Sequence, residues 1–226
     1  SEKKRNMCQA PCFSSMLWLV FSTGLLQFMH FFREFMQNSD LMLAIETSGR
    51  TGSVAVGRGD FVLSKSFSGY MRHSAELFGA VGELLKQADA ATADIRQVAI
   101  TAGPGSFTGL RIAVTAAKMF HFALRTPIVA LDSLDVIAEN ASDYIRQSGR
   151  QADCAAVVLD AKKDYFYAAA YERTQAGWHK FYGTAMVTAQ ELLSVLAEKT
   201  HVLVLGEGLL YHKPRFEASF IHLLPS

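Results

Sequence analysis

Cysteine is scarce in this 226-residue chain, with only Cys8, Cys12 and Cys154. An odd number of cysteines, only one of which lies in the body of the chain, excludes a disulfide framework. The sequence also contains no Cys-x-x-Cys pair and no Cys/His cluster of the kind that binds zinc. We therefore interpret Cys154, beside Ala155 and Val157, as a small buried hydrophobic residue.

An excess of charge of either sign is missing as well. The chain has 22 basic and 21 acidic side chains and a net charge of +1. A domain that binds RNA on its own is usually distinctly basic, so this balance argues against autonomous RNA binding. Half of the residues are hydrophobic and 19% are charged, which indicates a globular chain with enough material for one large or two small domains.

Signatures of hydrolytic nucleophiles are also absent. The sequence contains no Gly-x-Ser-x-Gly elbow, and no Ser/His/Asp order stands out. Ser106 lies in a glycine-rich segment but has no evident base near it in the sequence. We therefore do not expect protease activity.

Residues 1–41 differ from the rest of the chain. Basic residues at 3–5 precede an apolar stretch at 16–32, a pattern that resembles a signal or anchor segment. The stretch is short for a membrane-spanning helix, which needs about 20 apolar residues. Three interpretations stay open: an upstream extension outside the working protein, an amphipathic membrane- or partner-associating helix, and an export signal. Membrane contact is expected only if 16–32 belongs to the working protein.

The body of the chain predicts an α/β fold. Short strands at 43–46, 53–57 and 61–67 are separated by turn residues, and such short connections demand antiparallel hairpins. A helix at 73–88, a strand at 97–101, a helix at 109–124, a strand at 128–131 and a helix at 133–145 follow. The order βββαβαβα gives a mixed sheet with helices on its faces, which is typical of the actin-like (ribonuclease-H-like) core.

A second unit follows a polar connection at 144–153. Strands at 155–159, 166–171 and about 178–181 precede a capping box at Thr188–Glu191, a helix to about 198 and a strand at 202–205. We interpret this unit as a degenerate second copy of the core. The expected organisation is an N-terminal extension at 1–41, a first subdomain at 42–150 and a smaller second subdomain at 151–226, which we expect to be shortened by one helix at its C-terminal end.

The most distinctive segment joins the strand at 97–101 to the helix at 109–124. It reads GPGSFTGLR, and its three glycines allow backbone conformations that other residues avoid. Such a loop can aim backbone N–H groups and a helix dipole at an anion. It can equally serve as a tight connection that lets the helix and the strand pack closely. Both interpretations stay open on spacing alone.

The nine residues resemble the GPGSFTGLR segment of the TsaB (YeaZ) family, which is related to TsaD (Gcp) and belongs to bacterial threonylcarbamoyladenosine tRNA modification. The segments 42–48, 73–77 and 160–167 support the resemblance, which runs from about 42 to 225. Its signature loop comprises Gly103, Pro104, Gly105, Ser106, Phe107, Thr108, Gly109 and Arg111. This chain departs from the family pattern at Glu46, Gly79, Ala113, Met119, Lys162 and Tyr165, which puts partner geometry in doubt more than membership.

The resemblance implies a cytoplasmic, non-catalytic subunit that binds TsaD, with TsaE joining a larger complex. TsaD transfers the threonylcarbamoyl group to the adenosine beside the anticodon, and tRNA reaches this chain only through the complex. A homodimer is expected when TsaD is absent. The first two helices form the interface, so the candidates are His73, Leu77, Val81, Arg111, Ala113, Thr115, Ala116, Met119 and Phe120.

No catalytic residue, metal or cofactor of its own is expected, although ATP or ADP is expected at the interface with TsaD. The weak nucleotide-proximal candidates are Glu46, Thr47, Ser48, Asp160, Lys162, Gly206 and Gly208. The His-x-x-x-His metal pair of TsaD falls on about Ser133 and Ile137, which cannot replace imidazole. Leu77 stands four residues after His73, so His73 is expected to hydrogen-bond at a helix start. A stand-alone actin-fold ATPase or kinase, or a TsaD-type transferase, is the alternative.

Overall fold

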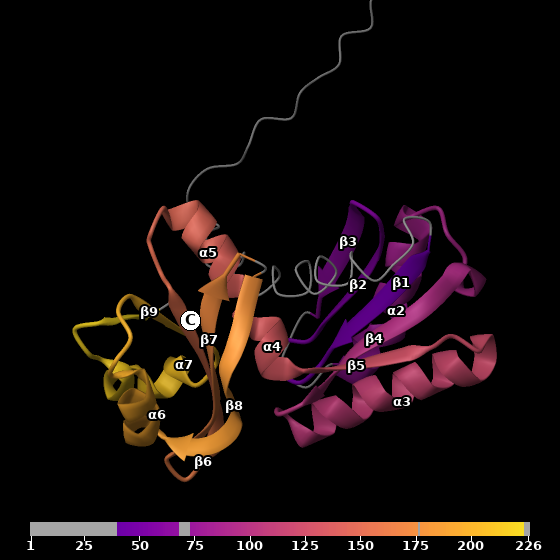
Figure 1. Cartoon of the computed structure of the whole chain (residues 1–226). Helices are drawn as coiled ribbons and strands as arrows, with labels where there is room; N and C mark the ends of the chain where they lie inside the picture. The colour runs from indigo at the N-terminus through magenta and orange to yellow at the C-terminus, as the bar shows by residue number, and fades with distance from the viewer. Residues whose placement is uncertain (1–39, 68–72, 176, 224–226) are drawn as a thin grey trace, which may run out of the picture.

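The computed structural model describes residues 40–67, 73–175 and 177–223 (Figure 1). The interpretations of residues 1–39 therefore lie outside the described residues. The described chain forms two lobes, each built on a five-stranded sheet. The first strand begins at Leu41, two residues before the predicted start at 43, because Leu41 is buried and pairs with Ile95.

The first lobe contains the sheet β3-β2-β1-β4-β5. Its strands are β1 (Leu41–Glu46), β2 (Ser53–Arg58), β3 (Phe61–Ser66), β4 (Ile95–Gly103) and β5 (Ile128–Asp132). β1, β2 and β3 are antiparallel, as the short turns between them require, whereas β1, β4 and β5 are parallel. A short 3-10 turn, η1 (Thr92–Asp94), leads into β4.

Two helices cover the outer face of this sheet: α2 (His73–Gln87) and α3 (Phe107–Leu124). Their apolar positions recur at helical spacing and pack on alternate residues of β1, β2 and β4. α3 begins at Phe107, two residues before the predicted start, because the Ser106 side chain accepts a hydrogen bond from the Gly109 N–H and caps the helix.

The second lobe repeats the topology of the first, with the sheet β10-β9-β6-β7-β8. Its strands are β6 (Cys154–Lys162), β7 (Tyr165–Thr174), β8 (Gly177–Thr188), β9 (Val202–Leu205) and β10 (Ile221–Leu223). The helices α6 (Ala189–Leu196), α7 (Leu209–His212) and the 3-10 turn η2 (Lys213–Phe216) pack on its outer face. β8 is longer than predicted, and β10 was not predicted.

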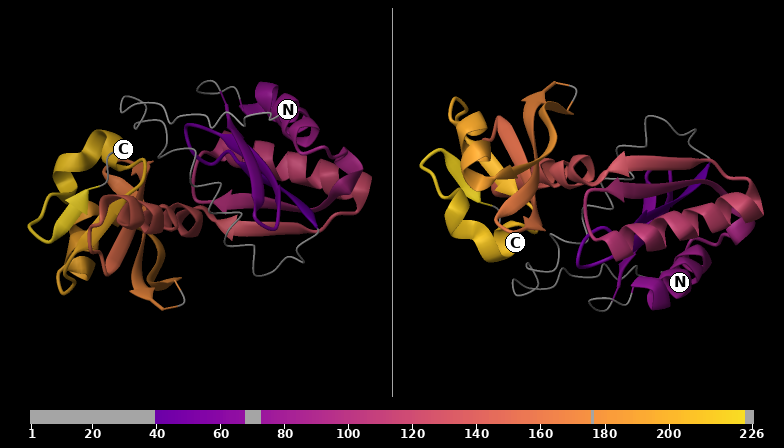
Figure 2. Two further views of the ribbon diagram at one scale, coloured as in Figure 1. Left: turned by 90° about the horizontal axis from the view of Figure 1, so that it is seen from above. Right: turned by 90° about the horizontal axis from the view of Figure 1, so that it is seen from below.

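The segment predicted as one helix at 133–145 is two helices, α4 (Ser133–Ala138) and α5 (Asn140–Ser148). α4 is shared by the lobes: Leu134 and Ala138 pack on the second sheet, and Val136 packs on Met42 and Ala44 of the first. Both sheets are therefore buried on their inner faces, with α4 between them (Figures 1 and 2).

Three antiparallel strands followed by parallel crossover strands, repeated in two lobes around a shared helix, make this an α/β fold of the actin-like type. This confirms the predicted fold class. Within the described residues, no helix is long and apolar enough to cross a membrane.

Candidate functional site

The glycine-rich loop 103–109 is packed against the end of β1. The Thr47 hydroxyl donates a hydrogen bond to the Gly109 carbonyl oxygen at 2.7 Å, and the Ser106 N–H donates to the Ser48 carbonyl oxygen at 2.7 Å. These bonds join the start of α3 to the β1–β2 turn. The Ser106 N–H and the Gly109 carbonyl group of the loop are therefore used in hydrogen bonds within the fold.

Two glycines of this loop are needed for the close approach. A Cβ atom at Gly109 would lie 1.7 Å from the Thr47 carbonyl oxygen, and a Cβ at Gly105 would lie 2.6 Å from the Ser48 carbonyl oxygen. Real Cβ atoms do not reach such distances, and both neighbours are backbone atoms that cannot move aside. The observed contacts favour the tight-connection interpretation over the anion-binding one.

The β1–β2 turn, which contains the nucleotide-proximal candidates Thr47 and Ser48, is held by side-chain hydrogen bonds. Glu46 Oε1 accepts hydrogen bonds from the Ser48 N–H at 2.5 Å and the Ser48 hydroxyl at 2.6 Å. His73 Nε2 lies 3.3 Å from the Arg50 carbonyl oxygen, to which its N–H tautomer donates. The turn is therefore fixed from both sides by residues of the first lobe.

The corresponding groups of the second lobe are engaged as well. The Lys162 N–H donates to Asp160 Oδ1 at 2.7 Å, and the Gly208 N–H donates to the Val158 carbonyl oxygen at 3.0 Å. Gly206 has a φ of +116°, and a Cβ there would lie 2.3 Å from the same carbonyl oxygen. Gly206 and Gly208 thus close the β9–α7 turn onto β6 in the way that loop 103–109 closes onto β1.

A carboxylate of the second lobe reaches the β1–β2 turn of the first. Glu207 Oε1 accepts a hydrogen bond from the Arg50 N–H at 2.8 Å and lies 2.8 Å from the position of a Cβ at Gly49. Burial raises the pKa of Glu207, and the Arg50 hydrogen bond and charge oppose that rise. The Arg50 guanidinium also bonds the Tyr211 hydroxyl. We call Arg50, Glu207 and Tyr211 the interlobe clasp.

The clasp brings the two lobes' candidate segments together at one place. Glu46, Thr47 and Ser48 precede Arg50 in the β1–β2 turn, and Gly206 and Gly208 flank Glu207. Asp160 and Lys162 lie instead at the end of β6, before the β6–β7 turn, where Asp164 forms an ion pair of 2.7 Å with Arg215 of η2. The backbone N–H groups of Ser48, Arg50 and Lys162, which a phosphate would need, already have acceptors within the chain. These residues therefore do not fit a nucleotide as they stand.

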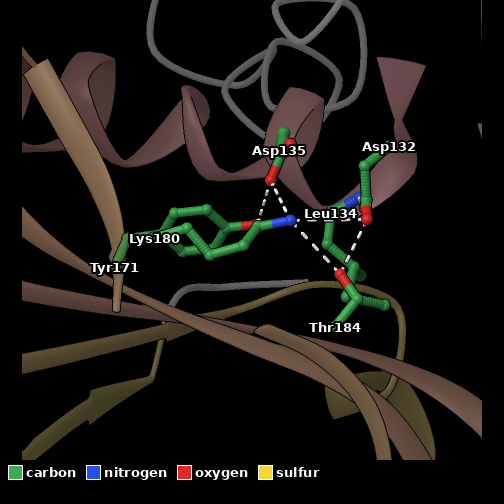
Figure 3. Close-up of polar contacts among 6 residues, drawn as sticks. All are labelled: Asp132, Leu134, Asp135, Tyr171, Lys180 and Thr184. Carbon is green, nitrogen blue, oxygen red and sulfur yellow. Dashed lines mark hydrogen bonds and ion pairs between the residues drawn. The ribbon is translucent and has the colours of Figure 1, made fainter. Parts of the chain in front are cut away.

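A second polar cluster joins β5 and α4 of the centre to β8 (Figure 3). Asp132 caps α4 by accepting from the Leu134 N–H at 2.7 Å, and its other oxygen accepts from the Thr184 hydroxyl at 2.7 Å. The Lys180 ammonium lies 2.5 Å from Asp135 and 3.3 Å from Asp132. The buried Tyr171 hydroxyl donates to Asp135 at 2.8 Å, and burial, followed by Asp135, raises the pKa of Tyr171.

The proposed partner-interface residues divide into two groups. Most of them are buried in the first lobe. Its hydrophobic core contains Leu77, Val81, Ala113, Ala116 and Phe120, whereas His73 contacts Phe67 and the Arg50 carbonyl group. α2 and α3 turn the Val81, Ala113 and Phe120 side chains toward the core of this lobe, so these three residues are not part of its exposed surface. Arg111, Thr115 and Met119 remain exposed.

The exposed side of α2 and α3 carries a groove with a volume of about 310 Å³. It is lined by Ser74, Leu77, Phe78, Thr108, Arg111, Ile112, Thr115, Ala116 and Met119. Phe78 is 48% exposed and Met119 is 53% exposed. We call the groove formed by these nine lining residues the α2–α3 groove. Two further residues of α3 that do not line it, Phe107 and Phe122, are 67% and 79% exposed.

The sequence analysis did not predict the exposure of Phe78, the contact of Glu207 with Arg50 or the ion pairs of Lys180. The apolar excess of α3 was the one signal that pointed to an outward-facing surface. Among the described residues, no three His, Cys, Asp or Glu side chains form a metal-binding group. Ser133, the expected counterpart of a TsaD histidine, is buried, and its hydroxyl has no hydrogen-bond partner in the described part of the chain.

The repeated topology, the shared central helix and the closed turns define a two-lobed actin-like protein. Residues 69–219 match the family model described as TsaD, tRNA N6-adenosine threonylcarbamoyltransferase. The structure is similar to that of YeaZ from Pseudomonas aeruginosa, with a TM-score of 0.70 and 27% identity over 83% of this chain and 84% of that one.

Curated relatives agree with the structural match. The tRNA threonylcarbamoyladenosine biosynthesis protein TsaB of Bacillus subtilis (strain 168) is 33% identical over 180 residues, which cover 78% of this chain and 75% of that protein. TsaB of Escherichia coli (strain K12) is 31% identical over 140 residues, or 61% and 58% of the two chains. The chain belongs to the TsaB family of tRNA threonylcarbamoyladenosine biosynthesis proteins.

Proposed function

We propose that this chain is a non-catalytic subunit of threonylcarbamoyladenosine biosynthesis that docks on a TsaD-type transferase through the α2–α3 groove. The observation that carries the proposal is the exposed apolar surface of this groove. Large apolar side chains that are about half exposed side by side are uncommon on a monomer and mark an interaction surface. A helix of the partner is the occupant that fits a groove between two helices.

The charge of the groove supports a protein partner with an apolar face. Arg111 is the charged residue among the residues that line it, and its guanidinium stacks 3.8 Å above the Phe107 ring. The groove is therefore mainly apolar apart from the single cation of Arg111. A partner helix with apolar anchors and one carboxylate opposite Arg111 satisfies both features.

The engaged turns support a subunit without its own nucleotide chemistry. The donors of Ser48, Arg50 and Lys162 serve Glu46, Glu207 and Asp160. ATP or ADP, where it takes part, binds at the interface with the transferase. TsaE joins as a third subunit, and tRNA is reached through the assembled complex.

The test is quantitative binding of the purified chain to a TsaD-type transferase, measured by calorimetry. Met119→Glu and Phe78→Glu are each expected to weaken binding by about tenfold or more, because each places a charge in a desolvated interface. Met186→Glu is the matched control, since Met186 is 58% exposed on β8 of the second lobe.

Unchanged binding by both groove variants would overturn the docking proposal. A second copy of this chain in the groove would give a wild-type dimer that Met119→Glu converts to a monomer in sedimentation. A purified wild-type chain that hydrolyses ATP or transfers the threonylcarbamoyl group without partners would instead contradict the non-catalytic assignment.

A further inference from the structure

A small cavity lies beside α4, away from the α2–α3 groove. It has a volume of about 160 Å³ and is lined by Leu131, Asp135, Val136, Ala138, Glu139, Tyr171, Trp178 and Lys180. Its walls are mainly apolar and aromatic, with a few charged groups at defined places. Pockets for drug-sized ligands measure about 300–1000 Å³, so this cavity suits a group of side-chain size.

Glu139 is the polar group of this cavity that the described part of the chain leaves without a hydrogen bond or ion pair. It lies between α4 and α5, and its side chain does not cap the helix. Its charged neighbours are Asp143 and Asp135. Burial, and then these two carboxylates, raise the pKa of Glu139. A bound cation therefore stabilises the ionised form of this half-buried carboxylate more than it would stabilise an exposed carboxylate.

The cation already present in the cavity does not serve Glu139. The Lys180 ammonium lies 2.5 Å from Asp135 and 3.3 Å from Asp132, and it donates to the Thr184 hydroxyl at 3.2 Å (Figure 3). Lys180 is thus bound by the carboxylates at one side of the cavity. The carboxylates of Asp132, Asp135 and Glu139 outnumber this single ammonium.

The aromatic walls are held in place by their polar ends. Trp178 Nε1 donates to the Ser142 hydroxyl at 2.8 Å, and the Tyr171 hydroxyl donates to Asp135 at 2.8 Å. The rings therefore line the cavity in fixed positions. Aromatic rings attract cations in desolvated sites, most strongly in the case of tryptophan. The carboxylate of Glu139, unpaired within the described residues, and the fixed ring of Trp178 form a cation-recognising arrangement.

We propose that this cavity binds a compact organic cation, an alkylammonium or alkylguanidinium group, with Glu139 as its counter-ion and the Trp178 ring as its aromatic wall, since the Tyr171 ring already faces the Lys180 ammonium, 5.6 Å from its centroid. The apolar lining from Leu131, Val136 and Ala138 takes the alkyl part. Two sources offer this chemistry: a free small amine, and a lysine or arginine side chain of a partner protein.

The test uses the intrinsic fluorescence of Trp178. The chain has two tryptophans, Trp18 and Trp178, so a Trp18→Phe background leaves Trp178 as the reporter. n-Butylammonium and ethylguanidinium are titrated against it, with n-butanol as the neutral control of similar size. We expect a saturable change with both cations, weakened about tenfold or more by Glu139→Gln, because a charge-assisted hydrogen bond is lost. Glu198→Gln, at an exposed position, is the matched control and leaves the titration unchanged.

The outcomes separate the sources and decide the proposal. Tighter binding of backbone-blocked lysine or arginine derivatives than of the free cations assigns the cavity to a partner side chain, and the reverse assigns it to a small molecule. Equal binding of n-butanol, an unchanged titration in Glu139→Gln, or no saturable change with any cation would overturn the proposal. Ligand-observed saturation-transfer NMR gives the same comparison without relying on Trp178.

Discussion

Glu207 Oε1 accepts a hydrogen bond of 2.8 Å from the backbone N–H of Arg50, although 157 residues separate them in the chain. The bond runs from the β9–α7 turn of the second lobe to the β1–β2 turn of the first. The Arg50 guanidinium lies over the Tyr211 ring, 5.2 Å from its centroid, and adds a second contact between the same segments. The lobes are thus joined through the β1–β2 turn of the first and the β9–α7 segment of the second.

Removing this carboxylate is expected to loosen the lobes. Glu207→Ala leaves the Arg50 N–H without its acceptor and should lower the free energy of unfolding by about 1–3 kcal/mol. The Arg50 amide should also exchange its hydrogen faster, because its bond to Glu207 is gone. Denaturant titration and amide hydrogen exchange measure the two effects. Glu198→Ala serves as the exposed control, and equal exchange at Arg50 in both variants would contradict an interlobe role for Glu207.

The stability contribution of Glu139 is expected to depend on pH. Burial and the neighbouring carboxylates raise its pKa in the folded protein above the ordinary value of 4.5. The folded state therefore holds the proton more tightly than the unfolded state, so the contribution of Glu139 is fully present below pH 4.5 and is lost as the pH rises through the folded pKa. Glu139→Gln imitates the protonated form at every pH.

The melting temperature of Glu139→Gln should therefore exceed that of the wild type at pH 8 in the absence of an added cation. The difference should shrink as the pH falls toward 4.5. Thermal melts at several pH values measure it, with Glu198→Gln reporting the general effect of removing one carboxylate. A difference that stays constant across this range would show that Glu139 ionises as freely in the folded chain as in the unfolded one.

The elements of the fold followed from local patterns, but the site did not. The alternating and helical spacings of the first lobe predicted the ends of β1 to α3 to within two residues, and the Thr188–Glu191 capping box marked α6. The break at Glu139 was missed because the apolar spacing continues through it. Ala113 was assigned to a partner surface because a stripe of small residues looks the same whether it faces a sheet or another protein.

Contacts between segments distant in sequence had no local signal. Glu207 looked like a turn residue between two glycines, and Lys180 like one polar position of a strand. Their roles depend on Arg50, and on Asp132 and Asp135, which only the arrangement of the lobes brings near. The exposure of Phe78 also had no local signal. α2 has more apolar surface than its own sheet covers, and the sequence does not show which of its apolar residues stay uncovered.

The β6–β7 turn is expected to gain stability from a residue suited to its backbone. Lys163 has a φ of 53°, a left-handed conformation that costs a non-glycine residue about 1 kcal/mol or more. Asparagine adopts it readily, so Lys163→Asn should raise the free energy of unfolding by about 0.5–1 kcal/mol. Lys118→Asn, within α3, is the control and should lower it, because asparagine is a poorer helix former than lysine. Urea titration distinguishes the two, and a loss of stability in Lys163→Asn would argue against strain at this turn.

The strongest single-site effect is expected at Gly109. Gly109→Ala puts a Cβ 1.7 Å from the Thr47 carbonyl oxygen, so α3 has to move away from β1 and break the bond from the Thr47 hydroxyl. The free energy of unfolding should fall by about 3 kcal/mol or more, since backbone overlap and a lost buried hydrogen bond add. Gly79→Ala is the matched control, because no heavy atom lies within 4 Å of its added Cβ and α2 is exposed there. It should raise stability by about 0.5–1 kcal/mol through helix propensity. Chemical denaturation of both variants tests the contrast. Equal stability of the two would mean that the glycines of this loop do not hold α3 against β1.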